Sequence, residues 1–269
     1  MRLLYIFRQF TGFILFLFIL SSCNMNKEST IEQKEKKVIF TENKTQIDKV
    51  KQRSFEINNI SKEYTAEIIM DSCDDQKCEG KGSIKLIEKK TRSVFQTFTS
   101  DDLIFDIDSI NVSTDRGSKY YNEDSPLIFD DFNFDGTEDL AIRNGHRSGY
   151  GGPSWDVYVY NSTRKQFVLS KELTELAVNY LGMFQTDHKR KRLITNGKSG
   201  WAWHITTEYE VVPKKGLLKV YELEEDGTKD DENMIVTLRK LINNKWTITT
   251  KIYKDKDYEN DYENIHKND

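Results

Sequence analysis

Apolar and polar residues alternate along much of the second half of the chain. In the segment WHITTEYEVV, the apolar and β-branched positions that share one face are Trp203, Ile205, Thr207, Tyr209 and Val211. The segments WDVYVYN (155–161) and KWTITTKIY (245–253) alternate in the same way, and β-branched and aromatic residues dominate all three. A period of two places every second side chain on the same side of a strand, so these segments predict β-strands.

Turn signals and the scarcity of helical patterns extend this prediction to the whole domain. Asp226-Gly227 and Asn243-Asn244 separate strand-like runs, and the chain has only three prolines. A helical pattern occurs in LSKELTELAVNYL, residues 169–181. We therefore predict an all-β domain of antiparallel strands with at most one short helix. The strands are expected to form a β-propeller-like array of small sheets or, alternatively, a β-sandwich.

The N-terminus has the pattern of a bacterial lipoprotein signal. Arg2 and Arg8 give a positive stretch before an apolar run, FILFLFIL, that is too short to span a bilayer as a mature helix. The run ends in Leu-Ser-Ser followed by Cys23, which is the order of residues in a lipobox. We predict that residues 1–22 are a signal peptide and that Cys23 carries acyl chains, such as palmitate, that anchor the protein. Asn24 in place of Asp favours the outer membrane, with the protein facing the periplasm.

Composition divides the mature chain into one β-rich domain and two polar ends. Residues 23–54 are polar and charged, so we expect a flexible tether in which residues 36–42 could form a separate strand. Residues 255–269 repeat Asp-Tyr-Glu-Asn and are expected to be a disordered tail. The β-rich domain is assigned to residues 55–254. The net charge of −4 and the interspersed charges exclude a nucleic-acid footprint.

An even pair of cysteines remains once the lipidated cysteine is set aside. Cys73 and Cys78 are separated by four residues. This spacing suits a disulfide that closes the loop between strands expected at 64–70 and 83–88, in an exported compartment that permits disulfides. Metal and redox pairs more often have two intervening residues, and no other Cys or His lies nearby. A structural disulfide is therefore favoured.

The segment DFNFDGTEDL, residues 131–140, places oxygen-bearing side chains at alternate positions. Counted from its first residue, positions one, three, five, seven and nine are Asp131, Asn133, Asp135, Thr137 and Asp139. Calcium takes six to eight hard oxygen ligands, and Gly136 permits the sharp turn that would bring them together. Phe132 and Phe134 can point into the core. A solvated acidic turn is the simpler alternative, since Asp, Asn and Gly are ordinary turn residues. The spacing favours structural calcium.

This loop differs from an EF-hand. Position twelve is Ile142 instead of a bidentate Glu, and the flanks at 127–129 and 140–142 have the pattern of strands. A second acidic cluster, residues 224–233, lacks the alternating spacing and is expected to form a solvated hairpin turn. Because no base is placed beside the loop, we expect the ion to serve architecture and not catalysis.

A glycine-rich loop follows the strand that ends at Arg143. Its central residues are His146, Arg147, Ser148, Gly149, Tyr150, Gly151 and Gly152. Glycine lets the backbone approach another surface closely, and tyrosine offers a large contact area at low conformational cost. The segment suits a recognition loop, but its residues fit equally well a flexible hairpin loop whose tyrosine lies on its own protein.

The order of these motifs resembles a family of bacterial calcium-binding lipoproteins. The resemblance rests on the lipobox, the short-loop cysteine pair, DFNFDGTEDLAI, SGYGGPSWDVYVY and the strand GWAWHITTEYE. Characterised members are immunity proteins that inhibit lysozyme-like peptidoglycan hydrolases delivered by bacteria-killing type IV secretion systems. The resemblance covers residues 64–253. It implies a β-propeller-like fold, calcium on Asp131, Asn133, Asp135, Thr137 and Asp139, and an inhibitory loop centred on Tyr150.

Two other function classes were weighed against an inhibitor. A surface lipoprotein with structural calcium could bind glycan or protein through Tyr150, Trp201 and Trp203, although core packing is the preferred explanation for Trp203. An enzyme is disfavoured because no nucleophile elbow occurs and the four histidines, His146, His188, His204 and His266, lack ligand spacing. Glu208 and Glu210 are interpreted as a solvated strand face, and residues 188–192 as an exposed basic turn.

Overall fold

The computed structural model describes residues 52–110, 121, 124–229 and 232–266, all of which belong to one unit of the chain. The predicted signal peptide, Cys23, nearly all of the tether and the possible strand at 36–42 lie outside these residues. The described chain begins in a strand at Arg53, so regular structure starts two residues before the predicted domain boundary. No helix in the described ranges is long and apolar enough to cross a membrane.

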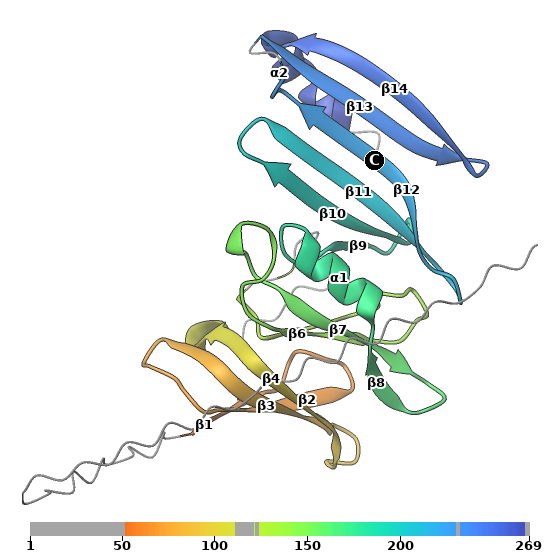
Figure 1. Ribbon diagram of the computed structural model, residues 1–269. Helices are drawn as coiled ribbons and strands as arrows, with labels where there is room; N and C mark the ends of the chain where they lie inside the picture. Colours follow the sequence, from red (N-terminus) through yellow and green to blue (C-terminus); the bar gives the residue numbers. More distant parts are fainter. Residues whose placement is uncertain (1–51, 111–120, 122–123, 230–231, 267–269) are drawn as a thin grey trace, which may run out of the picture. The chain divides into compact units, whose positions relative to one another are not determined.

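Three antiparallel sheets make up the described part of the chain (Figure 1). Sheet A has the order β1-β2-β3-β4, with strands β1 (Arg53–Ile57), β2 (Tyr64–Met70), β3 (Lys77–Glu88) and β4 (Val94–Asp106). Sheet B has the order β5-β6-β7-β8, with strands β5 (Leu127–Asp130), β6 (Asp139–Arg143), β7 (Trp155–Asn161) and β8 (Gln166–Leu169). Both sheets are meanders in which each strand pairs with its neighbour in sequence.

Sheet C is the largest and has the order β14-β13-β12-β11-β10-β9. Its strands are β9 (Gln185–Asp187), β10 (Arg192–Ser199), β11 (Trp203–Val212), β12 (Gly216–Asp226), β13 (Asn233–Ile242) and β14 (Lys245–Lys254). Asn243 and Asn244 both have positive φ, which suits the two-residue turn between β13 and β14. The prediction of an all-β fold built from small antiparallel sheets is confirmed.

Sheet B carries apolar side chains on both of its faces. Leu127 and Phe129 of β5 belong to a core cluster with sheet A, whereas Ile128 between them belongs to a second cluster with α1 (Lys171–Asn179), β10 and β11. Alternate residues of a strand point to opposite faces, so a run that is apolar at every position is buried on both sides. The turns and loops that leave sheet B are therefore held by packing on two sides.

The helix predicted within residues 169–181 is confirmed as α1. Ser170 caps it by accepting a hydrogen bond from the backbone N–H of Leu173. Leu173, Leu176 and Ala177 are buried on the face that packs against β7. This spacing of three and one positions keeps the apolar side chains on one stripe of the helix.

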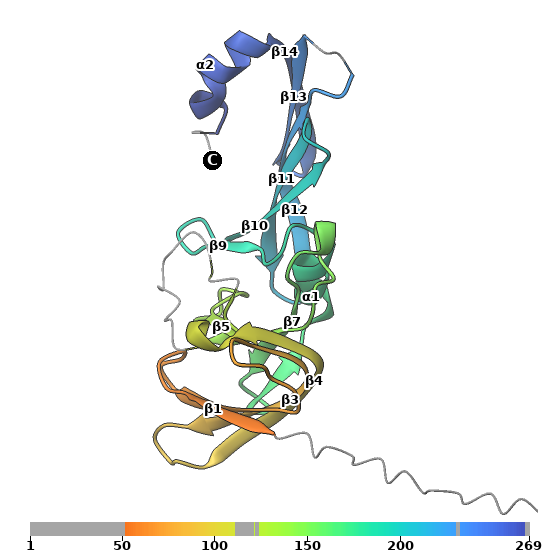
Figure 2. The same cartoon turned by 90° about the vertical axis from the view of Figure 1, so that its left-hand side faces the viewer.

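The predicted disordered tail and the limit of one helix were wrong. Residues Asp255–His266 form α2, which lies against one side of sheet C near β13 and β14 (Figure 2). Tyr258 and Ile265 of the helix pack against the buried Leu223, Val236 and Tyr253 of the sheet. Tyrosine and isoleucine supply the apolar contact, and the acidic Asp261 of the helix also faces the sheet, where it accepts from the Tyr253 hydroxyl at 3.1 Å.

Candidate functional site

The loop that links β5 to β6 contains the predicted calcium ligands. Asp130 and Asp139 are opposite each other in the two strands, so the loop between them leaves and returns to adjacent positions. Phe132 is fully buried, and its ring meets that of Phe184 edge-on at 5.4 Å. Phe134 and Gly136 have positive φ values of 60° and 91°. The expectation that Phe132 anchors the loop in the core is confirmed.

The acidic and amide side chains of this loop turn inward toward its own backbone. The Asp131 carboxylate accepts from the backbone N–H groups of Asp135 and Gly136, at 3.0 and 2.8 Å. Asn133 Oδ1 accepts from Asp135 N–H at 2.9 Å, and Asp135 Oδ1 accepts from the N–H of Thr137. The backbone therefore coils around the side-chain oxygens at positions one, three and five.

Asp139 lies at the end of the loop, where β6 begins, and is fully buried. One of its oxygens accepts from the N–H groups of Phe132 and Asn133, and the other accepts from the N–H of Tyr160. Burial raises the pKa of Asp139 to about 7, and the nearby Asp135 and Asp131 charges add to this rise against the lowering effect of the backbone donors. A bound cation would reduce the electrostatic repulsion among the three carboxylates of this short loop.

The donor chemistry of the loop suits a hard cation. Among the described residues, no three His, Cys, Asp or Glu side chains are gathered into a ready-made metal cluster. The predicted set, however, draws on an amide at Asn133 and a backbone carbonyl at Thr137 as well as three carboxylates, and calcium accepts all three kinds of oxygen. The residue types and the coiled backbone therefore fit the predicted ion.

The glycine-rich loop between β6 and β7 is held at both ends. Arg147 N–H donates to Ser154 Oγ, and Ser148 N–H donates to the carbonyl of Gly152 at 3.2 Å. Gly149 N–H donates to the carbonyl of Tyr180 at 2.7 Å. A Cβ at Gly149 would lie 3.1 Å from that same carbonyl, so this close approach favours glycine. These backbone hydrogen bonds hold the loop in place.

Tyr150 is the exposed tip of this loop. It sits in a short 3-10 turn, Gly149–Gly151, in a left-handed conformation with φ 59° and ψ 26°. Its side chain is 66 % exposed, yet its hydroxyl accepts from Gly200 N–H at 2.7 Å and Lys198 Nζ lies 4.9 Å from the ring centre. Non-glycine residues adopt this conformation only when the surroundings enforce it. The tyrosine is therefore exposed and also fixed in place.

The turn between β10 and β11 adds a second exposed aromatic residue beside Tyr150. Trp201 is 87 % exposed and follows the glycine that binds the Tyr150 hydroxyl. Trp203 is half-buried and donates its indole N–H to Glu224 at 2.9 Å, but it belongs to none of the core clusters found among the described residues, so the predicted core packing is not confirmed. His146 and Arg147 are exposed near the tip, and Ser148 is buried. The turn that carries Trp201 is thus joined to Tyr150 through Gly200.

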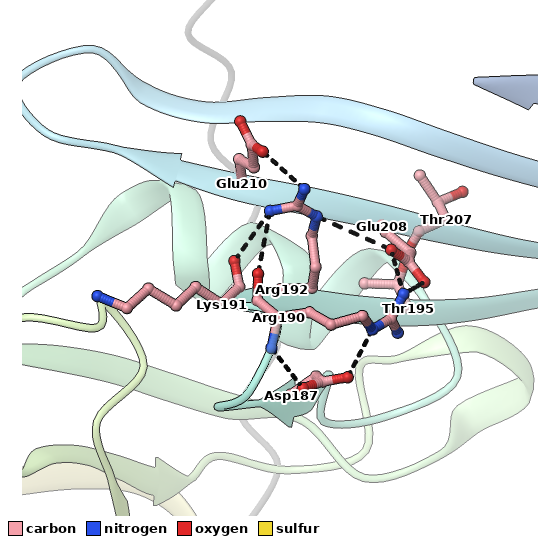
Figure 3. Close-up of polar contacts among 8 residues, drawn as sticks. All are labelled: Asp187, Arg190, Lys191, Arg192, Thr195, Thr207, Glu208 and Glu210. Carbon is pink, nitrogen blue, oxygen red and sulfur yellow. Dashed lines mark hydrogen bonds and ion pairs between the residues drawn. The ribbon is translucent and has the colours of Figure 1, made fainter. Parts of the chain in front are cut away.

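A buried ion-pair network on β11 was not predicted from the sequence (Figure 3). Glu208 is 3 % exposed, and its carboxylate binds Arg190 Nη1 at 2.9 Å and lies 3.9 Å from Arg192 Nε. Arg190 also binds Asp187, and Arg192 binds Glu210. The interpretation of Glu208 as a solvated residue was therefore wrong, whereas residues 188–191 do form a turn in which His188, Lys189 and Lys191 are exposed. The spacing of Glu208 and Glu210 on a strand does not indicate that the turn carrying Arg190 will cover one of them.

Of the remaining predicted features, the disulfide is confirmed. Cys73 and Cys78 form a disulfide in the loop between β2 and β3. Of the acidic cluster at 224–233, residues 224–226 end β12, and Glu225 and Asp226 are buried, so the prediction of a solvated turn was wrong for this part. Asp226 accepts from Thr228. Of the four histidines, His188 pairs with Asp130 at 2.9 Å and His266 with Glu225 at 3.1 Å.

Comparisons with known proteins add a likeness of fold. No protein-family model matches the chain, and no curated protein matches it. Among solved structures, the chain resembles a type IV secretion system related protein from Xanthomonas, with a TM-score of 0.57 and 20 % sequence identity. The likeness covers 76 % of this chain and 95 % of that protein. At this identity, it shows a shared fold.

Proposed function

We propose that this protein is a periplasm-facing lipoprotein that inhibits a lysozyme-like peptidoglycan hydrolase. The observation that carries the proposal is Tyr150, an exposed aromatic ring at the tip of an ordered glycine-rich loop. A rigid aromatic contact loses little conformational entropy when it enters a partner's cleft. The fold likeness to a type IV secretion system related protein supports a protein partner in that context.

The inhibitory surface combines the aromatic tip with hydrogen-bond donors. Hydrolases of the lysozyme type work with two carboxyl groups in a cleft that binds sugar. Tyr150 would occupy the sugar position, while the exposed Arg147 guanidinium and His146 imidazole offer donors for the carboxylates. Inhibition of this kind needs only a complementary shape, so it requires no catalytic group on this chain and we propose no enzymatic activity.

Calcium has a structural role in this proposal. Asp131, Asn133, Asp135, Asp139 and the carbonyl of Thr137 would hold the ion, which supplies positive charge among three carboxylates. The loop lies at the end of β6, and the inhibitory loop leaves the other end of the same strand. A stiffened loop at one end of β6 would therefore help to fix the strand that positions Tyr150.

The proposal is tested with full-length protein and a lysozyme-like muramidase acting on cell walls, followed by loss of turbidity. Tyr150→Ala should reduce protection at least tenfold, because a buried aromatic contact is among the strongest in an interface. The matched control is Trp246→Ala, which removes a partly exposed aromatic residue from β14 and should protect as the wild type does. Equal protection by both variants would remove the loop from the mechanism.

The ion is tested separately by melting the protein in chelator and in millimolar calcium. Saturating calcium at about 100 times its Kd should stabilise the fold by about 2.7 kcal/mol. Asp135→Asn should lose most of this gain while leaving the disulfide and the strands intact. An identical melting temperature in chelator and in calcium would show that the loop is an acidic turn.

The alternative function is a lipoprotein that binds glycan or another protein and inhibits nothing. The neighbouring exposed rings of Tyr150 and Trp201 favour it, because two solvent-facing aromatics offer a platform for sugar rings. Binding of soluble glycan in calcium, without any effect on muramidase, would decide for this alternative.

A further inference from the structure

A cleft of about 940 Å³ lies on the side of sheet C that α2 covers. Strands β9 to β12 form one wall, and the other wall comes from Tyr258, Tyr262 and His266 of α2. None of its lining residues belongs to the calcium loop or to the loop of Tyr150. The cleft has the size of a small-ligand site and is separate from the proposed inhibitory surface.

The charged groups that line this cleft already have partners of opposite charge or strong donors. Arg190 binds Asp187 at 2.7 Å and Glu208 at 2.9 Å. Glu225 accepts from the Tyr258 hydroxyl at 2.6 Å and contacts His266 Nε2 at 3.1 Å. A charged ligand would have to displace one of these partners, so the walls favour a neutral ligand.

The remaining wall groups are neutral hydrogen-bonding side chains and aromatic rings. Gln185 and His204 have no side-chain partner within the described part of the chain, and Asn196 engages only its oxygen, with Thr206 at 3.2 Å. Tyr262 is 48 % exposed, and its ring stands 4.3 Å from that of His266. Amide and imidazole groups can both donate and accept, which matches hydroxyl groups.

We propose that this cleft binds a short neutral oligosaccharide. A sugar ring has an apolar C–H face that can lie on the Tyr262 ring and an edge of hydroxyls that can reach Gln185, Asn196 and His204. Aromatic side chains combine such apolar contact with a polar tip. A volume of about 940 Å³ leaves room for a few sugar rings. The ligand class thus follows from three features of the cleft. Its charged groups are paired, the amides of Gln185 and Asn196 can bind hydroxyls, and the Tyr262 ring is exposed.

The test is calorimetric titration of the full-length chain, kept in a detergent without a sugar headgroup. The probes are tri-N-acetylchitotriose and maltotriose, with spermidine and inorganic phosphate as charged comparisons. At least one trisaccharide should bind, and both charged probes should bind more weakly. Tyr262→Ala should weaken trisaccharide binding about tenfold, as expected for the loss of one stacked ring. Tyr262→Phe should retain the binding.

Matched variants on the other aromatic surface locate the site. Tyr150→Ala and Trp201→Ala should bind the trisaccharide as the wild type does, because neither residue lines the cleft. If Tyr262→Ala lowers the melting temperature, Gln185→Ala on β9 is used instead. It changes the opposite wall of the cleft and should likewise weaken trisaccharide binding. The proposal is overturned if neither trisaccharide binds, if a charged probe binds more tightly, or if only Trp201→Ala abolishes binding. Muramidase inhibition is a separate assay, so either proposal can fail alone.

Discussion

Replacing Glu208 by glutamine tests how much the buried ion-pair network contributes to stability (Figure 3). The substitution keeps the shape of the side chain and one oxygen acceptor, and it removes the negative charge. That charge faces Arg190 at 2.9 and 3.1 Å and Arg192 at 3.9 Å, with the Glu208 side chain only 4 % exposed. We expect a clear loss of stability, because two arginines lose their shared buried partner.

The magnitude follows from opposing terms. Two unit charges 2.9 Å apart attract by about 6 kcal/mol at an effective dielectric constant of about 20. Desolvation of the pair offsets several kcal/mol of this, and removal of one partner from a fully buried pair costs about 3–5 kcal/mol. Arg190 keeps Asp187 and is 35 % exposed, so its charge stays partly solvated. We therefore expect a loss of about 2 kcal/mol, or roughly 4–8 °C in melting temperature.

The assay is thermal and urea unfolding followed by circular dichroism, with Glu210→Gln as the control. Glu210 lies two positions along the same strand and pairs with Arg192 at 2.7 Å, but its side chain is 39 % exposed. An exposed pair contributes about 0–1 kcal/mol and weakens in salt. Glu208→Gln should thus cost more than Glu210→Gln, and the difference should persist at high salt.

Equal or smaller destabilisation by Glu208→Gln would refute this reasoning. Such a result would mean that the loop carrying Arg190 does not close over β11 as the contacts indicate. A destabilisation that disappears in high salt would show that water reaches the carboxylate.

Two further predictions concern stability. Replacing both Cys73 and Cys78 by alanine should lower the free energy of unfolding by about 2 kcal/mol, since the disulfide closes only a short loop, and the urea midpoint measures this. The Trp203 indole N–H and the Arg239 guanidinium hold the pKa of Glu224 below its ordinary value of 4.5. Its contribution is therefore fully present above that value and lost as the pH falls through the lower folded pKa. Melting temperatures of Glu224→Gln should fall less steeply with acid than those of the wild type; parallel curves would contradict the pairing.

The strands and the motifs near them could be predicted from local sequence. Alternation over residues 203–212 and 245–253 marks β11 and β14, and the paired asparagines between 242 and 245 mark the turn between β13 and β14. The strands flanking the acidic loop and the cysteine pair were equally readable. Each of these features depends on neighbours within a few residues, which one stretch of sequence contains.

The C-terminal helix could not be predicted in this way. Its polar composition suggests disorder, and α2 is ordered because Tyr258 and Ile265 find an apolar patch on sheet C. That patch is assembled from three strands. Helix stability in proteins comes mainly from such packing, which no local propensity contains.

The sequence by itself determined the all-β class, the disulfide pair, the oxygen-rich loop and the glycine-rich loop that contains Tyr150. Only the tertiary structure decided that Glu208 is buried between two arginines, that Tyr150 is held by Gly200, and that Gln185, Asn196 and His204 share a cleft with α2. The physical reason is range: turn chemistry and strand alternation act between near neighbours, whereas burial and ion pairing depend on which distant segments the sheets bring together.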